Sequence, residues 1–199
     1  MVLFLYFCSK LVTIMKAQLF ILLGLFAIAF SSCDMNGSSN STPEILFVSS
    51  PVVNKSDTLN RYATDDASVI RLDTIQVGDT VTFRMLFWGF SNNLSTCNII
   101  PSDTSATKIL LPPTNSLDSM FLASSSNYSK GNFVFKSHIQ SLYFPFRYVA
   151  KKVSNDAKIT FYLSSDADFS NTSSYGNNSF SIVLKTPIRV KKSILIGKL

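Results

Sequence analysis

The chain has 199 residues, of which 46% are hydrophobic and 15% are charged, and its formal net charge is +6. This length leaves room for about one domain beside a targeting segment. The mild positive charge permits contact with anionic lipid or polysaccharide but requires neither. With only Cys8, Cys33 and Cys97 as cysteines, the chain is not a scaffold held together by several disulfides.

The N-terminal segment is typical of an export signal. Lys16 is followed by an apolar run over residues 19–30 and by small residues before Cys33. A positive charge, an apolar core of about 7–15 residues and a small-residue cleavage region make up a secretory signal peptide. The run is shorter than the roughly 20 residues that a helix needs to cross a bilayer. We therefore predict a signal peptide over residues 1–32.

The end of this segment resembles the lipobox of bacterial lipoprotein signal peptides, in which small residues precede a cysteine. Ser31 and Ser32 match the small positions and Cys33 matches the acceptor. The resemblance implies a diacylglyceryl group on the Cys33 sulfur, cleavage before Cys33 and an acylated amino terminus. Two or more acyl chains hold a protein stably on a membrane. The chain thus resembles Bacteroidetes-type cell-envelope lipoproteins, which implies a lipid anchor in the outer membrane, facing the periplasm or the surface.

Residues 1–14 are also apolar, which leaves alternatives open. If translation starts at Met15, these residues are a misassigned start and the signal peptide begins there. Otherwise residues 1–30 can also form an uncleaved transmembrane helix, interrupted by Lys10 and Lys16. A plain secreted protein, cut at another site, is a third alternative.

The residues after the signal divide into a tether, a domain and a tail. Residues 34–43 are small and polar and favour a flexible tether. We predict a lipidated cysteine and tether over residues 33–43, a β-sandwich over residues 44–192 and a C-terminal tail over residues 193–199. Cys97 is the one cysteine in the predicted domain and lies in an apolar run, so we expect its thiol to be buried.

From Glu44 onward the chain consists of short runs that alternate apolar and polar residues, as half-buried strands do. Polar turns rich in serine, asparagine and glycine separate these runs, and no amphipathic helix is predicted after Cys33. Pro145 interrupts one of the longer runs, which indicates an edge strand or a bulge there. The predicted strands cover residues 45–48, 69–72, 81–88, 94–100, 108–111, 132–136, 142–148, 158–163, 180–185 and 187–190.

The strongest strand prediction follows the turn pair Gly78-Asp79. Val81, Phe83, Met85 and Phe87 then alternate with polar or exposed positions. The stretch from Val77 to Phe83 resembles the V-x-x-G-D-x-V-x-F pattern of bacterial immunoglobulin-like domains. The resemblance implies an immunoglobulin-like β-sandwich. With many short strands separated by turns, the predicted fold class is all-β, after an N-terminal signal helix.

The sequence predicts no catalytic residue, no metal site and no cofactor. His138 is the only histidine, and no second ligand stands at a suitable spacing. The nucleophile, zinc-protease and phosphate-loop motifs are absent. Glu44 is the only glutamate and most aspartates lie at predicted turns. An envelope glycan hydrolase that uses aspartates as acid and base stays an alternative.

Exposed aromatic residues are the candidate ligand contacts. Trp88, Tyr143 and Tyr162 have polar neighbours in the strand period and are predicted to face a ligand such as a glycan. We expect Phe144, Phe146 and Tyr148 to lie in the core. Nucleic acid is not an expected partner of an exported protein.

Four further residues match a loose modification signal. Each follows an aspartate and precedes an apolar residue, as in the D-[ST]-[apolar] sequon for O-glycosylation in Bacteroidetes. The resemblance implies candidate glycosylation at Thr58, Thr74, Thr80 and Ser119. The same tripeptide also arises by chance where a strand follows a turn.

These features together predict a lipid-anchored envelope protein that binds a glycan or an envelope protein, or serves a structural role, without catalysis. The glycan hydrolase and a subunit of a surface fibre are the alternatives. A fibre subunit would need an exposed strand edge or an exchanged terminal strand.

Overall fold

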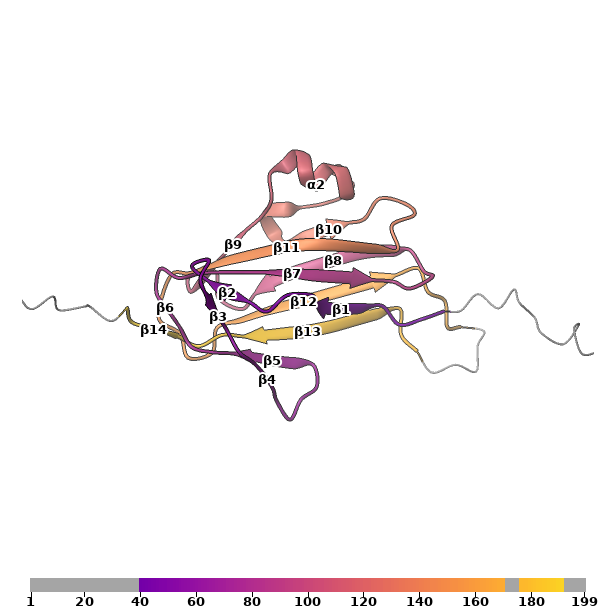
Figure 1. The fold of residues 1–199 in the computed structure, drawn as a ribbon. Coiled ribbons are helices and arrows are strands. Elements are labelled where there is room, and N and C mark those ends of the chain that lie inside the picture. The colour runs from indigo at the N-terminus through magenta and orange to yellow at the C-terminus, as the bar shows by residue number, and fades with distance from the viewer. Residues whose placement is uncertain (1–39, 171–175, 192–199) are drawn as a thin grey trace, which may run out of the picture. The chain divides into compact units, whose positions relative to one another are not determined.

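The computed structural model describes residues 40–170 and 176–191, which form two facing β-sheets (Figure 1). The predicted signal helix, Cys33, the tether up to residue 39 and the predicted tail lie outside the described residues. Within the described ranges, no helix is long and apolar enough to cross a membrane. The fold class is all-β, as predicted.

Sheet A has six strands in the order β3-β2-β7-β11-β9, with β1 also pairing with β7. All of its pairings are antiparallel. Its strands are β1 (Glu44–Phe47), β2 (Val52–Val53), β3 (Asp57–Thr58), β7 (Thr80–Trp88), β9 (Thr107–Leu110) and β11 (Ser141–Ala150).

Sheet B also has six strands, in the order β10-β8-β12-β13-β5-β4. Its pairings are antiparallel except for β13 with β5, which is parallel. Its strands are β4 (Arg61–Ala63), β5 (Val69–Leu72), β8 (Leu94–Pro101), β10 (Asn132–Val134), β12 (Lys158–Ser165) and β13 (Ser179–Lys185). Two short strands, β6 (Ile75–Gln76) and β14 (Ile188–Arg189), form a separate parallel pair.

The core lies between the inner faces of the two sheets. Every second residue of β7, from Val81 to Phe87, is buried, because successive strand residues point to opposite faces. Phe146 of sheet A meets Phe161 of sheet B edge to face, with 5.0 Å between ring centroids. Such aromatic pairs add to the stabilisation from burial alone. Cys97 is buried as predicted, and desolvation raises the pKa of its thiol.

One buried polar contact also lies in this core. The hydroxyls of Tyr148 and Thr186 are 2.8 Å apart, and both residues are buried. Burial raises the pKa of Tyr148, so this phenol stays neutral. A buried hydroxyl without a partner would be costly, so this contact satisfies both groups.

The ten predicted strand segments correspond to observed strands, and their ends differ by at most two residues. Pro145 lies in β11, between β7 and β9 in the sheet order. However, β9 pairs with β11 only from Arg147 to Ala150, so Pro145 has a neighbouring strand on one side alone. The Lys151 N–H points toward the β9 side of β11, where it donates to Ala106 O. Backbone N–H groups of every second strand residue point to the same side, so the nitrogen of Pro145 also faces the β9 side, beyond the end of β9. Its backbone is therefore locally unpaired, but β11 is an interior strand and not the edge strand or bulge that the sequence indicates.

The expectation of no helix after Cys33 is wrong. Helix α2 (Thr114–Met120) and the 3-10 helix η1 (Tyr128–Lys130) connect β9 to β10. Pro113 caps α2 without a side-chain hydrogen bond, and Leu117 is its buried residue. Such a short helix is stabilised by packing rather than by propensity, so its sequence carries little periodic signal.

The ordered domain begins before β1. Asn40 Oδ1 accepts hydrogen bonds from Asn92 Nδ2 (3.1 Å) and from the Asp168 N–H (3.2 Å). Thr42 Oγ1 accepts from the Asn177 N–H at 3.0 Å. Residues 40–42, which the sequence assigns to the tether, are therefore attached to the loops at one end of the sandwich.

The packing predicts that alanine substitutions at two neighbouring residues of β12 lower the free energy of unfolding by different amounts. Phe161→Ala leaves a cavity between the sheets and should lower the free energy of unfolding by about 3–5 kcal/mol. Tyr162→Ala removes an exposed ring from the outer face of sheet B and should cost less than about 1 kcal/mol. Urea unfolding of both variants measures this difference. Equal losses would contradict the assignment of Phe161 to the core.

Candidate functional site

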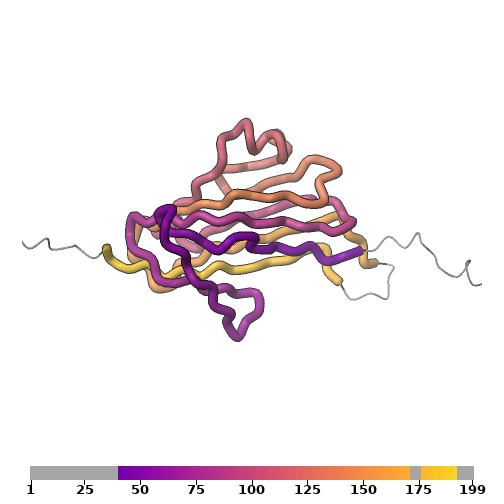
Figure 2. The backbone as a smooth tube through the Cα atoms, viewed as in Figure 1, coloured from indigo at the N-terminus to yellow at the C-terminus, as the bar shows by residue number. Residues whose placement is uncertain are grey.

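A groove opens on the outer face of sheet A where the chain leaves the β-ladder. Phe47 of β1 pairs with Met85 and Val52 of β2 pairs with Thr82, so the intervening residues detour around the edge of β7. Figure 2 shows this indigo part of the chain following β7. The detour includes Pro51, which has no N–H to donate to the ladder.

Residues of the detour still form hydrogen bonds with the backbone of β7. The Val48 N–H donates to Arg84 O at 2.9 Å, and Ser49 Oγ accepts from the Arg84 N–H at 3.0 Å. The serine side chain thus replaces a missing strand partner. The groove has a volume of about 1190 Å³ and is lined by Val48, Ser49, Ser50, Val52, Asn54, Lys55, Thr80, Thr82, Phe83, Arg84, Pro145 and Arg147.

Two arginines stand close together in this groove. Arg84 of β7 faces Pro145, and Arg147 of β11 faces Thr82, so the arginines are diagonal neighbours on the outer face. Such diagonal positions lie about 7–8 Å apart at Cα, within reach of long side chains. Both arginines are exposed, and Lys55 adds a third positive charge to the lining. None of the described residues that line the groove is acidic.

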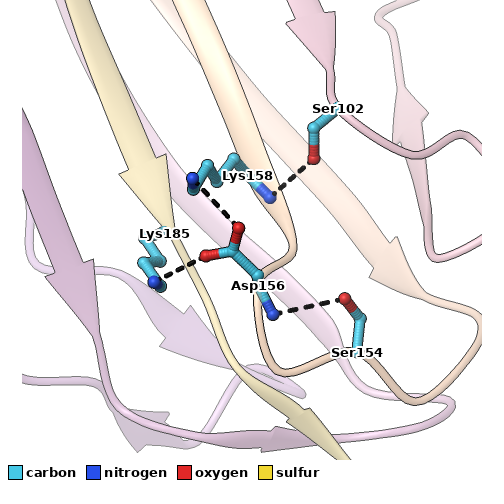
Figure 3. Close-up of polar contacts among 5 residues, drawn as sticks. All are labelled: Ser102, Ser154, Asp156, Lys158 and Lys185. Carbon is cyan, nitrogen blue, oxygen red and sulfur yellow. Dashed lines mark hydrogen bonds and ion pairs between the residues drawn. The ribbon is translucent and has the colours of Figure 1, made fainter.

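A second like-charged pair in the molecule is arranged differently. Lys158 and Lys185 lie opposite each other on sheet B, where their charges would repel. Asp156 lies between them, with carboxylate oxygens 3.0 Å from Lys158 Nζ and 2.5 Å from Lys185 Nζ (Figure 3). These lysines hold the pKa of Asp156 below its usual value. In the part of the chain that the structure describes, Arg84 and Arg147 have no such carboxylate.

Exposed aromatic side chains continue the outer face of sheet A beyond the groove. Tyr143 faces Leu86, and Trp88 follows two positions later along β7. Trp88 stacks on Phe90 with ring centroids 3.9 Å apart. Four residues of β-strand separate Arg84 from Trp88, or about 13 Å. A basic region and an aromatic region therefore share one face.

The three predicted aromatic contacts do not lie together. Trp88, Tyr143 and Tyr162 are 37%, 59% and 47% exposed. Trp88 and Tyr143 lie on sheet A, whereas Tyr162 lies on the outer face of sheet B, opposite Ser181. The three candidate rings therefore lie on two different faces, and Tyr162 is separate from the groove.

Several aspartates are held in their charged form by neighbouring donors. Hydrogen bonds lower the pKa of each of these carboxyls, and most of the donors come from the same turn or an adjacent loop. They are Asp66 with Ser68, Asp73 with Asn60 and Tyr62, Asp103 with Ser105, and Asp168 with Ser170. A general acid needs the opposite shift, toward a raised pKa. The described residues contain no group of three or more histidine, cysteine, aspartate or glutamate side chains suited to a metal.

The four candidate glycosylation residues differ in exposure. Thr58, Thr74 and Ser119 are exposed, and the Ser119 hydroxyl donates to Ser116 O within α2. Thr80 is half-buried in the groove lining, and its N–H donates to Asn54 Oδ1 at 3.0 Å. Glycosylation at these residues stays a prediction, with Thr80 the least accessible of them.

No motif or spacing in the sequence marks Arg84, Arg147 or Lys55 as functional residues. The strand period places Arg84 and Arg147 on outward positions, which the sequence alone shows. Their proximity depends on the pairing of β7 with β11, which are about sixty residues apart in the chain. The detour that brings Lys55 to the same groove also depends on pairing.

Comparisons with known proteins give no family for this chain. No protein-family model matches it, and no curated protein matches it. Several solved structures show distant likeness, among them these three. The secreted serine protease VesC from Vibrio cholerae is 11% identical, with 65% of this chain and 23% of that chain covered and a TM-score of 0.34. A protein described as BspA_C_mut is 14% identical, with 73% and 47% covered and a TM-score of 0.36.

The third structure is a family 123 glycoside hydrolase from Clostridium perfringens. It is 12% identical, with 76% of this chain and 28% of that chain covered and a TM-score of 0.36. The chain spans less than half the length of each of these three proteins. Likeness at this level carries no argument about function.

The first prediction from this site concerns Asp156. The pKa of Asp156 is lower in the folded protein than in the unfolded chain. The carboxylate therefore stabilises the fold at neutral pH, and this stabilisation is lost in acid as pH falls through the lowered pKa of the folded state. Asp156→Asn should therefore lower stability at neutral pH, and the difference from the parent should vanish in strong acid. Urea unfolding across pH measures both. Adding Lys185→Gln should restore part of the loss by removing the repulsion.

The second prediction concerns the unpaired arginines. Arg147→Gln removes a like-charged neighbour of Arg84, so it should raise the free energy of unfolding by roughly 0.2–1 kcal/mol at low salt. High salt should abolish the gain because it screens exposed charges. Unfolding curves at two salt concentrations test this. A loss of stability at low salt would mean that Arg147 has an intramolecular partner.

Proposed function

We propose that the protein is a lipid-anchored cell-envelope protein whose β-sandwich binds an anionic glycan, without catalysis. The observation that carries this proposal is the diagonal pair Arg84 and Arg147, in a groove whose lining contains no acidic residue. Two neighbouring cations without a carboxylate weaken the fold, whereas an anionic ligand between them would turn their repulsion into attraction.

The chemistry of the groove suits a carboxylated, phosphorylated or sulfated sugar. A guanidinium binds such anions through two parallel hydrogen bonds, while the Lys55 ammonium acts as a point charge. Ser50, Asn54 and Thr82 supply further polar groups in the lining. This set suits a flat, hydroxyl-rich ligand better than a purely apolar one.

The aromatic region supports a ligand that extends beyond the groove. Along the strands, Tyr143 presents ring surface about 7 Å from Arg84, and Trp88 about 13 Å from it. Aromatic rings with a polar tip provide apolar contact area beside hydrogen bonding, which suits the mixed faces of a sugar. A polymer lying along sheet A would meet both regions at once.

The proposed anchor is compatible with this placement. If Cys33 carries lipid, the chain up to Asn40 spans at most about 25 Å. Asn40 binds the loops that contain Asn92 and Asp168, at the end of the sandwich where β7 finishes with Trp88.

An immunoglobulin-like arrangement is part of the same proposal. Its support is the turn before β7, where Gly78 has a φ of +94° and the Asp79 carboxylate accepts from the Gln76 N–H at 2.7 Å. This local geometry fits the V-x-x-G-D-x-V-x-F resemblance. Residues other than glycine rarely adopt such a backbone conformation.

Binding to an acidic polysaccharide tests the function. We expect the protein to bind polygalacturonate in calorimetric titrations, and not neutral dextran. Arg84→Gln with Arg147→Gln should weaken this binding by about tenfold or more, because charge-assisted hydrogen bonds are lost. The matched control is Arg71→Gln with Arg189→Gln, which changes the charge equally at two exposed arginines outside the groove.

Two outcomes would contradict the proposed glycan site. In the first, neither polygalacturonate nor dextran sulfate binds the parent protein. In the second, the control pair loses affinity as much as the groove pair, which would mean that net charge alone attracts the polymer.

The anchor has its own test. In the native host, the mature N-terminal peptide should begin at Cys33 and carry the mass of its acyl groups, and Cys33→Ala should abolish that species. Mass spectrometry of the N-terminal peptide measures this. A protein that retains residues 1–30 would instead indicate a transmembrane helix.

A further inference from the structure

A second hollow lies at the side of the sandwich, apart from the arginine groove. It has a volume of about 560 Å³ and is bordered by β8, β9 and η1. Ile109 lies on the same face of β9 as its buried neighbour Thr107, and it pairs with the buried Tyr148. Ile99 and Phe133 are buried on the inner face of sheet B. The hollow therefore opens between the inner faces of the two sheets.

The two sheets leave this side open because their edge strands are short. β9 pairs only with β11, and β10 covers β8 only from Thr96 to Asn98. Beyond that point the chain closes on β8 through Gly131, whose carbonyl accepts from the Ile99 N–H at 2.8 Å. A Cβ at Gly131 would lie 2.1 Å from Ile99 O, and its φ is +73°, so glycine is required there.

The floor of the hollow is apolar. Ile99 and Phe133 are almost fully buried, whereas Ile109, Leu111 and Tyr128 are only partly buried and pack against the core. On their exposed side, Ile109, Leu111 and Tyr128 lack the dispersion contacts that a filled core provides. An apolar chain lying between the sheets would restore those contacts.

The rim is positively charged. Lys108, Lys130 and Lys151 line the hollow and are exposed. The described residues of the lining include no aspartate or glutamate, and the ion pairs formed among the described residues involve Lys158 and Lys185 instead. Two carboxylates lie beside the lining: Asp118 accepts from Tyr128 Oη at 2.8 Å, and Asp103 directly precedes Thr104 in the chain. Three ammonium groups thus surround the mouth of an apolar slot.

We propose that this slot binds an amphipathic anion with one hydrocarbon chain, such as a long-chain fatty acid. The hydrocarbon chain lies against the partly buried side chains Ile109, Leu111 and Tyr128, and the carboxylate is held at the lysine rim. Pockets of 300–1,000 Å³ with an apolar lining and a few polar groups are typical small-molecule sites. A single-chain amphiphilic anion provides both apolar contact with the floor and a negative charge at the rim. A sugar would lack apolar contact with the floor, and a neutral lipid would leave the lysines without a counter-charge.

Titration with myristate below its critical micelle concentration tests the slot. We expect saturable one-to-one binding by calorimetry. Methyl myristate, which lacks the charge, should bind about tenfold or more weakly, and butyrate, which lacks the chain, should not bind. Equal affinity for myristate and its methyl ester, or no binding of myristate, would overturn the proposal.

Two variants locate the binding. Lys108→Gln, Lys130→Gln and Lys151→Gln together should weaken myristate binding by about tenfold or more, whereas the same change at Lys136, Lys152 and Lys191, outside the lining, should not. Thr104→Trp places a large ring at an exposed position of the rim and should block the slot without touching the core. Undiminished binding in either slot variant would place the ligand elsewhere. Both variants keep Arg84 and Arg147, so polygalacturonate binding should persist and separates this proposal from the glycan site.

Discussion

The long pairing of β7 with β11 fixes what each face of the molecule presents. The two strands are in register from Ser141 opposite Trp88 to Val149 opposite Thr80. Since strand residues alternate between faces, burying Phe83 and Phe146 forces Arg84 and Arg147 outward. A slip by one residue would bury charge and expose rings. The core therefore determines the position of the arginines as firmly as any contact that they make themselves.

The outer faces of the two sheets differ in whether a carboxylate lies between their neighbouring positive charges. On sheet B, Asp156 lies between two facing lysines and removes their repulsion. On sheet A, the groove keeps two arginines and a lysine with no acidic residue in its lining. A fold selected for stability alone gains nothing from this second arrangement. A site that is less favourable when empty is better suited to a ligand of opposite charge, as recognition sites often trade stability for function.

The strand pattern was predictable because it depends on local alternation. The segments around Val81, Phe144 and Phe161 carry period two in their own sequence, and each is a strand with those residues buried. Short elements were missed for the opposite reason. Helix α2 has one buried residue, Leu117, and β2 and β3 have two residues each, too few for a period to show.

The candidate sites were harder to predict than the strands. Trp88 and Tyr143 were identified as exposed rings, since alternation reports exposure, but Tyr162 lies on the other sheet. Which outward residues meet is decided by pairing between distant segments. The arginine pair needs the register of β7 and β11, and the lysine slot needs β9 and β10 to be short. Neither the strand register nor the length of these edge strands can be deduced from a single stretch of the sequence.

Pro145 has a consequence for how copies of this protein meet one another. Beyond the end of β9, the edge of β11 has no partner strand among the described residues, and an unpaired edge is a template for pairing with a second chain. The proline nitrogen faces that edge and carries no hydrogen, so an incoming strand finds a gap in the row of donors. Lipid anchoring would concentrate such molecules in two dimensions, where encounters between edges are frequent. A single imino acid in the middle of β11 would then help to keep neighbouring copies separate.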